Sequence, residues 1–214
     1  MLSLTDQKMV APTVFVVDDD KEMRNSLRRL LMTMHLNVEL YSSAQEFMEH
    51  YKPEWPGCII LDMRMPRMGG LDLLAKLVEQ GVSTPVIIAT GHGDVPSAVR
   101  AMKGGAFGFI EKPFDEQELL DCVNGGIALD HEIRQEAARR KDISTRMAQL
   151  TARELEVLEL IISGKTNKII ATELNVSCKT VEAHRSRVMR KMQADSVANL
   201  AQLYFTSTAL SKRG

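Results

Sequence analysis

The stretch Ile59-Ile60-Leu61-Asp62-Met63-Arg64-Met65-Pro66 decides the fold. Its apolar run ends at a carboxylate, which is the pattern of a buried strand of a parallel sheet followed by a loop. In open α/β sheets, ligands bind beyond the carboxyl ends of the strands, so Asp62 is placed for chemistry. Taken alone, the pattern would also fit a solvated aspartate at a strand end.

Two further apolar runs end in the same way. Val14–Val17 is followed by Asp18–Asp20, and Val86–Ala89 is followed by Thr90. Because the carboxyl ends of parallel strands meet at one edge of a sheet, we expect these polar side chains to gather there.

Strand-like and helix-like segments alternate from residue 13 to about residue 130, which predicts βαβ units. The expected fold of residues 12–130 is a doubly wound (βα)5 α/β domain with a parallel sheet. The expected strands are residues 13–17, 38–41, 58–62, 86–90 and 107–111. Ser43–Glu46 matches a capping box at the start of the second helix, and Val95, Val99 and Met102 mark the fourth helix.

Residues 148–211 are expected to form an all-α domain of four helices. Thr151–Glu154 matches a second capping box, and Ser177 can cap the third helix. The second helix should turn Ile169, Ile170 and Leu174 inward. Two short helices joined by a tight turn predict a helix-turn-helix.

The segment between the two domains, residues 131–147, is expected to be a helical linker. It contains neither Gly nor Pro, and Glu136 and Arg140 form an i,i+4 pair of favourable order. We expect the last helix of the first domain to continue to about Lys141 and then to break. The alternative is a flexible charged tether.

Charge is distributed unevenly along the 214 residues. Residues 1–130 hold 12 basic against 19 acidic residues, a net −7, and residues 148–214 hold 10 against 6, a net +4. This asymmetry indicates two domains, of which the second faces a polyanion. Three widely spaced cysteines, no secretory signal and no membrane-spanning run favour a cytoplasmic protein with reduced thiols and no membrane partner.

The predicted sheet edge collects residues suited to phosphoryl chemistry: Asp18, Asp19, Asp62, Thr90 and Lys112. Clustered carboxylates repel unless a cation joins them, and Mg²⁺ is a hard ion that takes oxygen ligands. An aspartate can serve as a nucleophile toward phosphorus, while a lysine and a hydroxyl bind the remaining phosphoryl oxygens.

The third helix of the second domain separates into two faces when it is drawn as a wheel. Val181, Val188 and Met192 form the expected core stripe. The opposite face carries Lys179, Glu182, Ala183, Ser186, Arg187 and Arg190. Basic residues interleaved with small ones suit the major groove of DNA, although a solvated basic face is the alternative. His184 and Arg185 lie nearer the core stripe.

Residues 13–130 resemble the receiver domain of two-component response regulators. The matching pieces are VVDDD (16–20), LDMRMP (61–66), ATGHGD (89–94) and GAFGFIEKPF (105–114). The resemblance implies that Asp62 is the phosphoacceptor and that Lys112-Pro113 is a cis peptide. It also implies a site assembled from Mg²⁺ ligands (Asp18, Asp19, Asp62 and the backbone carbonyl of Arg64) and switch residues (Thr90, Lys112 and Phe109). Asp20 stands where the family often has Glu.

Residues 150–192 resemble the LuxR-type helix-turn-helix, including its T-x-R-E start and T-V-x-x-H-R run. The resemblance implies contacts with backbone phosphates from Asn167, Lys168, Lys179, Thr180, His184 and Arg185. Contacts with base edges are implied for Glu182, Ala183, Ser186 and Arg187.

A receiver followed by this domain is the arrangement of NarL/FixJ-type response regulators. The resemblance implies that the chain is a transcriptional activator and not an enzyme. It also implies that a sensor histidine kinase phosphorylates this activator. A homodimer would then bind double-stranded DNA and act on RNA polymerase.

Two alternatives remain. One is an aspartate-nucleophile phosphatase of the haloacid-dehalogenase type, whose D-x-D-x-T/V signature is absent at residues 18–22. The other is a phosphorylation-independent transcription factor that uses the receiver fold only to dimerise.

Overall fold

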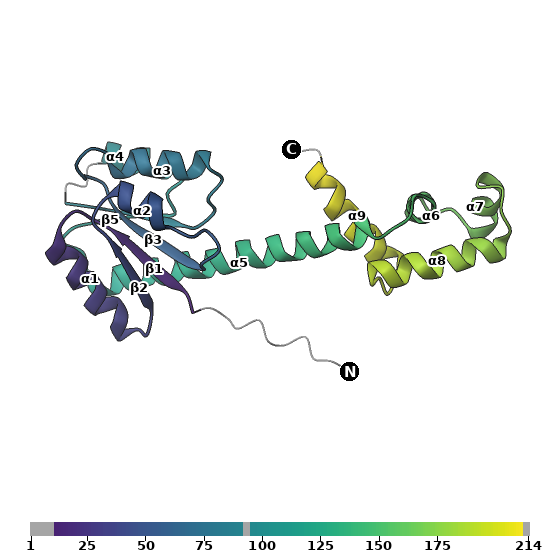
Figure 1. Cartoon of the computed structure of the whole chain (residues 1–214), viewed down its shortest axis with the longest axis horizontal. Helices are drawn as coiled ribbons and strands as arrows, with labels where there is room; N and C mark the ends of the chain where they lie inside the picture. The colour runs from purple at the N-terminus through teal and green to yellow at the C-terminus, as the bar shows by residue number, and fades with distance from the viewer. Residues whose placement is uncertain (1–10, 92–94, 212–214) are drawn as a thin grey trace. The chain divides into compact units, whose positions relative to one another are not determined.

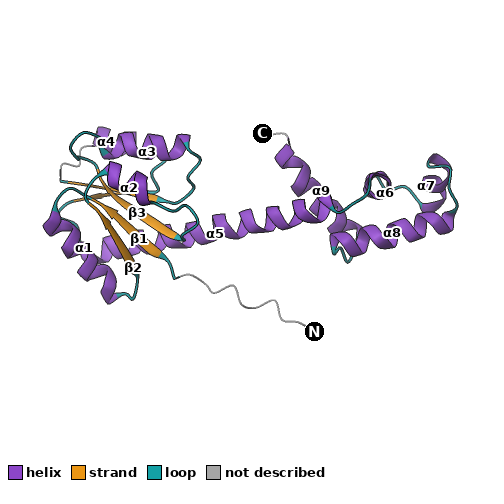
Figure 2. Cartoon of the chain, viewed as in Figure 1, coloured by secondary structure: helices purple, strands orange, loops and turns teal. Residues whose placement is uncertain are grey.

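The computed structural model describes residues 11–91 and 95–211. The chain divides into two compact units between Arg134 and Gln135. Figure 1 shows the order of the elements, and Figure 2 shows strands in the first unit and helices alone in the described part of the second.

The first unit is built on a five-stranded parallel sheet in the order β2-β1-β3-β4-β5. Its strands are β1 (Thr13–Val17), β2 (Asn37–Tyr41), β3 (Gly57–Asp62), β4 (Val86–Thr90) and β5 (Gly108–Glu111). The predicted doubly wound α/β fold is therefore confirmed. The strand order reverses at β1, so that β1 pairs with both β2 and β3, and ligands of doubly wound sheets bind at such a switch point.

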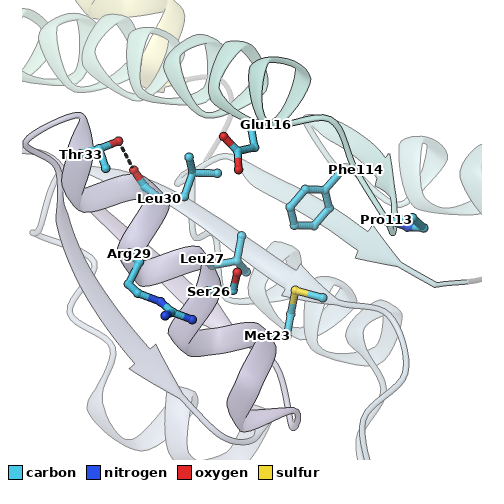
Figure 3. A pocket seen from close by; sticks show the side chains of 9 residues that line it. All are labelled: Met23, Ser26, Leu27, Arg29, Leu30, Thr33, Pro113, Phe114 and Glu116. Atoms are coloured by element: carbon cyan, nitrogen blue, oxygen red, sulfur yellow. Dashed lines mark hydrogen bonds between the residues drawn. The ribbon is translucent and has the colours of Figure 1, made fainter.

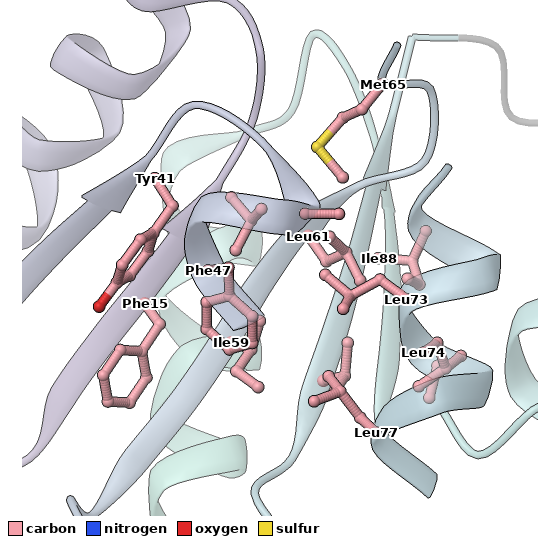
Figure 4. Close-up of a cluster of buried hydrophobic side chains, with 14 of the residues drawn as sticks. Phe15, Tyr41, Phe47, Ile59, Leu61, Met65, Leu73, Leu74, Leu77 and Ile88 are labelled. Carbon is pink, nitrogen blue, oxygen red and sulfur yellow. The ribbon is translucent and has the colours of Figure 1, made fainter. Parts of the chain in front are cut away.

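Five helices cover the sheet: α1 (Lys21–Thr33), α2 (Ala44–His50), α3 (Gly70–Glu79), α4 (Val95–Lys103) and α5 (Glu116–Ala148). Successive strand residues point to opposite faces. Phe15 and Leu61 therefore pack with α2, α3 and α4 in one core, part of which Figure 4 shows. Val14 and Ile60 pack with α1 and α5 in a second core. Both faces of the sheet are buried, as a parallel sheet requires.

One local expectation for the first unit, the capping box of α2, needs correction. Ser43 caps α2 by accepting from the backbone N–H of Glu46, but the Glu46 carboxylate reaches back to Ser42, one residue before the cap. The capping box is thus not reciprocal.

The fourth helix forms as predicted, and the apolar residues that mark it face outward, since Val95 is 77 % exposed and Met102 is 50 % exposed. The small residues Ser97 and Ala101 form the buried face of α4 instead.

The second unit contains α6 (Ala152–Ile162), α7 (Asn167–Glu173), α8 (Cys178–Met192) and α9 (Val197–Ser211). The capping box at Thr151 and Glu154 is complete, and Ser177 caps α8 by accepting from the N–H of Thr180. The prediction that Ile169 points inward is wrong, because this side chain is 47 % exposed while Ile170 is fully buried. Consecutive residues of a helix lie about 100° apart, so Ile169 and Ile170 cannot share one narrow face.

Helix α5 does not break near Lys141, as the sequence led us to expect. It continues to Ala148 because its last turns belong to the core of the second unit. Ile143 is 1 % exposed within that core. Arg146 donates to the backbone carbonyl of Met192, at the end of α8, and also pairs with Asp142.

The first half of α5 is fixed to the first unit by an ion pair whose carboxylate is buried. The Asp130 carboxylate accepts from Nε of Arg134 at 2.7 Å and from the backbone N–H of Gly57 at 2.8 Å. Arg134 also donates to the carbonyls of Pro53, Glu54 and Trp55. Only glycine fits at residue 57, since an added Cβ would lie 1.8 Å from the carbonyl oxygen of Thr13.

Candidate functional site

Lys112 joins two buried carboxylates at the carboxyl edge of the sheet. Its Nζ lies 2.6 Å from Oδ2 of Asp18, which follows β1, and 2.5 Å from Oδ1 of Asp62, which ends β3. Both carboxylates are almost fully buried. The predicted convergence of Asp18, Asp62 and Lys112 on this edge is therefore confirmed by the geometry.

The turn after β1 holds Asp18 in place. The backbone N–H of Asp20 donates to Oδ1 of Asp18 at 2.8 Å. The Asp20 side chain caps α1 by accepting from the N–H groups of Glu22 and Met23. Asp20 is thus engaged with the helix, while Asp19 is exposed beside Asp18.

The loop after β3 orients the second carboxylate. Oδ2 of Asp62 accepts from the backbone N–H of Arg64 at 2.7 Å. The backbone N–H of Gly70, at the start of α3, donates to the carbonyl of Met63 at 2.9 Å. Gly70 permits this close approach, because a Cβ there would lie 2.3 Å from the carbonyl oxygen of Asp62.

Burial and pairing shift the proton affinities at this site. Burial raises the pKa of the Asp62 carboxyl, and the hydrogen bond from Lys112 opposes that shift. Burial alone would lower the pKa of Lys112, but its hydrogen bonds to Asp18 and Asp62 outweigh burial and raise it. The ammonium group is therefore held in its charged form between the two carboxylates.

The arrangement can accept a divalent cation. Oxygens of Asp18 and Asp62 already converge on one cationic nitrogen. Asp18, Asp19 and Asp62 against Lys112 formally leave two uncompensated negative charges. Carboxylate oxygens are the ligands that Mg²⁺ prefers. The described residues do not, however, bring three acidic, histidine or cysteine side chains together at one point, so the contribution of Asp19 stays a prediction.

Two predicted switch residues lie on the neighbouring strands. Thr90 ends β4 and is 1 % exposed, and its backbone carbonyl accepts from the backbone N–H of Lys112 at 2.6 Å. Phe109 pairs with Ile88 across β4 and β5 and packs, half-buried, against the core that contains α4. The Lys112–Pro113 peptide bond is cis, as predicted.

A groove of about 460 Å³ lies between α1 and the start of α5, next to Lys112. Figure 3 shows Leu27 and Leu30 of α1 on one side and Pro113 and Phe114 on the other. The groove presents apolar side chains beside the acidic edge.

In the second unit, the two faces predicted for α8 are confirmed. Val181, Val188 and Met192 are fully buried. The residues proposed for the opposite face are all exposed: Lys179, Glu182, Ala183, Ser186, Arg187 and Arg190. This leaves a polar helix face, with more basic than acidic residues, open to a partner.

The remaining predicted DNA contacts lie around the start of α7 and the flank of α8. Arg185 donates to the side-chain oxygen of Asn167 at 3.4 Å, so these two residues lie together. Lys168 is exposed, and Thr180 is partly exposed. His184 is partly buried, and its Nδ1 makes no hydrogen bond to the described residues.

Two polar contacts were not foreseen from the sequence. Arg24 donates from Nη1 to the backbone carbonyl of Asp18 at 2.6 Å. Glu154, 3 % exposed, pairs with Lys191 of α8 at 2.6 Å. That hydrogen bond lowers the pKa of Glu154 to about 2. The capping box indicated a role for Glu154, but no motif indicated that Lys191 would pair with it or that Arg24 would contact Asp18.

Comparison with known proteins assigns each unit of the chain to a family. Residues 14–124 match the response regulator receiver domain, and residues 148–204 match the bacterial regulatory proteins of the luxR family. The chain therefore belongs to the two-component response regulators that join a receiver domain to a LuxR-family DNA-binding domain and regulate transcription.

Within that class, the chain is of the FixJ type. It is 41 % identical to the transcriptional regulatory protein FixJ of Bradyrhizobium diazoefficiens, over 89 % of this chain and 93 % of FixJ. It is 39 % identical to the response regulator TodT of Pseudomonas putida, over 90 % of this chain and 85 % of TodT. The solved structure of the response regulator StyR shares 45 % identity and a TM-score of 0.85, over 91 % of this chain and 98 % of StyR.

Two further findings concern the described residues of both units. None of the helices in the described ranges is both long and apolar enough to cross a membrane. Cys58, Cys122 and Cys178 are free thiols.

Proposed function

We propose that Asp62 accepts a phosphoryl group from the phosphohistidine of a sensor kinase. The observation that carries this proposal is the pairing of one Asp62 oxygen with Lys112 and of the other with the N–H of Arg64. An oxygen of Asp62 would bond to phosphorus as the phosphorus–nitrogen bond of the donor breaks. Lys112 and the Arg64 N–H would then stabilise charge on the phosphoryl oxygens.

The same proposal includes Mg²⁺, held by Asp18, Asp19, Asp62 and the backbone carbonyl of Arg64. When bound, the ion would neutralise negative charge on the incoming phosphoryl group. Two observations support this set of ligands: Asp18 and Asp62 are buried, and the Asp20 side chain is engaged as the cap of α1.

The sensor kinase has to approach Asp62 from the carboxyl edge of the sheet. We propose that the kinase contacts the groove formed by α1 and the start of α5, where the partly exposed Leu30 and Phe114 offer apolar surface (Figure 3). An apolar patch beside a polar reactive centre is typical of a recognition surface.

Phosphorylation is proposed to act through Thr90 and Phe109. A phosphoryl group on Asp62 would attract the Thr90 hydroxyl at the end of β4 and the Lys112 ammonium. The space vacated by Thr90 would admit Phe109, which lies on the adjacent strand.

The consequence proposed for this switch is dimerisation. The surface formed by α4 and β5 would change, and α4 already exposes Val95, Val99 and Met102. Burying these apolar side chains against a second copy would favour a dimer.

The dimer is proposed to bind paired half-sites on double-stranded DNA. Helix α8 would enter the major groove, with Glu182, Ala183, Ser186 and Arg187 near base edges. Backbone phosphates would be contacted by Asn167, Lys168, Lys179, Thr180, His184 and Arg185. We expect activation through RNA polymerase, in the cytoplasm, and a steep loss of DNA affinity with salt because phosphate contacts release counterions.

Intact-mass measurement tests the central step. The wild type and Asp62→Asn would be incubated with Mg²⁺ and acetyl phosphate. We expect one phosphoryl adduct on the wild type and none on the variant. If an active donor leaves the wild type unmodified, the chain regulates transcription without phosphorylation and the receiver serves only as a dimer module.

A further inference from the structure

We propose that Arg24 is a positioning residue of the cation site, which holds the Asp18 main chain so that the Asp18 and Asp62 carboxylates converge on one ion. Arg24 lies in the first turns of α1, and its Nη1 donates to the backbone carbonyl of Asp18 at 2.6 Å. This inference rests on the proposed function, because the ion in question is the Mg²⁺ that would assist phosphorylation of Asp62.

The polar groups of Asp18 each have an identified partner. Its N–H donates to the carbonyl of Tyr41, which ties the strand end to β2. One carboxylate oxygen accepts from the N–H of Asp20 and the other from Lys112. The backbone carbonyl accepts from Arg24. That carbonyl belongs to the peptide plane between Asp18 and Asp19, so Arg24 sets the orientation of the bond that joins the two acidic residues.

The backbone of α1 uses its own donors elsewhere. The N–H groups of Glu22 and Met23 donate to the Asp20 side chain. The N–H of Arg24 donates to the carbonyl of Asp20. The donor that reaches the Asp18 carbonyl is instead a side chain, and the planar guanidinium of Arg24 gives that donor a fixed direction.

The direction in which Mg²⁺ affinity changes when Arg24 is replaced distinguishes a positioning role from an effect of its charge alone. Arg24 carries a positive charge close to a site for a divalent cation, so its charge alone opposes metal binding. Removing the charge should tighten binding if charge were its whole contribution. Removing a group that positions a metal ligand weakens binding, typically by about 10- to 100-fold.

Isothermal titration calorimetry with MgCl₂ and no phosphodonor distinguishes these cases in the full-length chain. The variants are Arg24→Gln, Arg24→Lys and the control Arg28→Gln. Arg28 is exposed one turn further along α1, so its substitution removes the same charge without touching Asp18. Circular dichroism would establish that each variant is folded.

We expect Arg24→Gln to bind Mg²⁺ about tenfold more weakly than the wild type. Arg28→Gln should bind unchanged or slightly more tightly. Arg24→Lys, which keeps the charge and one flexible donor, should fall between Arg24→Gln and the wild type.

If Arg24→Gln binds Mg²⁺ as tightly as Arg28→Gln does, the positioning role of Arg24 is overturned, while the proposed cation site stands. If Arg24→Gln does not fold, Arg24→Lys decides alone, and wild-type affinity in that variant would overturn the role. A wild-type chain that binds no Mg²⁺ would overturn the proposed cation site together with this inference.

Discussion

Replacing Lys112 with Met should make the unphosphorylated chain bind Mg²⁺ more tightly. The ammonium group of Lys112 lies 2.6 Å from Asp18 and 2.5 Å from Asp62, and so occupies the oxygens that we propose as metal ligands. Met fills a similar volume and removes the charge.

The magnitude follows from the same geometry. Both oxygens lie within 2.6 Å of one nitrogen, so they are no more than about 5 Å apart. Two negative charges at that separation repel each other by about 3 kcal/mol at an effective dielectric constant of about 20. In the wild type, Lys112 offsets this repulsion, and an incoming ion must displace or share two hydrogen bonds worth about 1.5–3 kcal/mol each. If the ion no longer has to displace even one of these hydrogen bonds, Mg²⁺ should bind about tenfold more tightly.

Calorimetric titration at pH 8, where carboxylates are ionised, measures the effect. Lys76→Met is the matched control, because Lys76 is exposed on α3 and its loss changes the net charge equally. We expect the dissociation constant of Lys112→Met to fall at least about tenfold below that of the control. An unchanged or higher constant would refute the reasoning that Lys112 and the metal compete for the same oxygens.

Three further predictions concern the second unit. Ile143→Ala should reduce the free energy of unfolding of that unit by about 2–5 kcal/mol, against under about 0.5 kcal/mol for the exposed Lys141→Ala. Hydrogen exchange of the α8 amides measures this, and equal protection in both variants would contradict it. The pKa of Glu154 is lowered to about 2, first by its hydrogen bond from Lys191, from an ordinary value of 4.5. Its contribution to stability should therefore be complete above about pH 4.5 and be lost as the pH falls through about 2. Thermal unfolding should show this dependence in the wild type but not in Glu154→Gln, and equal curves would contradict it. Arg187→Ala should cost about 1–3 kcal/mol on specific DNA and relax sequence preference. Fluorescence anisotropy on specific and random duplexes tests this, and an equal loss on both would reassign Arg187 to phosphate contact.

Periodicity predicted most elements because burial imposes it. The core face of α8 follows from Val181, Val188 and Met192, which recur at helical spacing and are fully buried. The same reasoning did not reveal the orientation of α4, where Val95 and Met102 are exposed. An apolar helix face indicates a surface that favours burial. The sequence of one chain does not reveal whether the core of that chain or another molecule buries it.

The convergence of Asp18, Asp62 and Lys112 could be predicted because the strand ends of a parallel sheet meet at one edge. The contact of Arg24 with the Asp18 carbonyl could not be predicted, since a hydrogen bond from a side chain to the main chain produces no repeating pattern in the sequence. The role of Asp20 was open to prediction, as aspartate is a preferred helix cap. The metal ligands that the resemblance implies, Asp18, Asp19 and Asp62, do not include this capping residue.

Helix α5 has a practical consequence for recombining these domains. The family matches end at residue 124 and resume at residue 148, yet Arg134 is tied to the first unit and Ile143 is buried in the second. A chimera joined at the family borders would sever one core or the other. Fusions joined between residues 135 and 142, within the helix and in phase with its turns, would leave both hydrophobic cores whole.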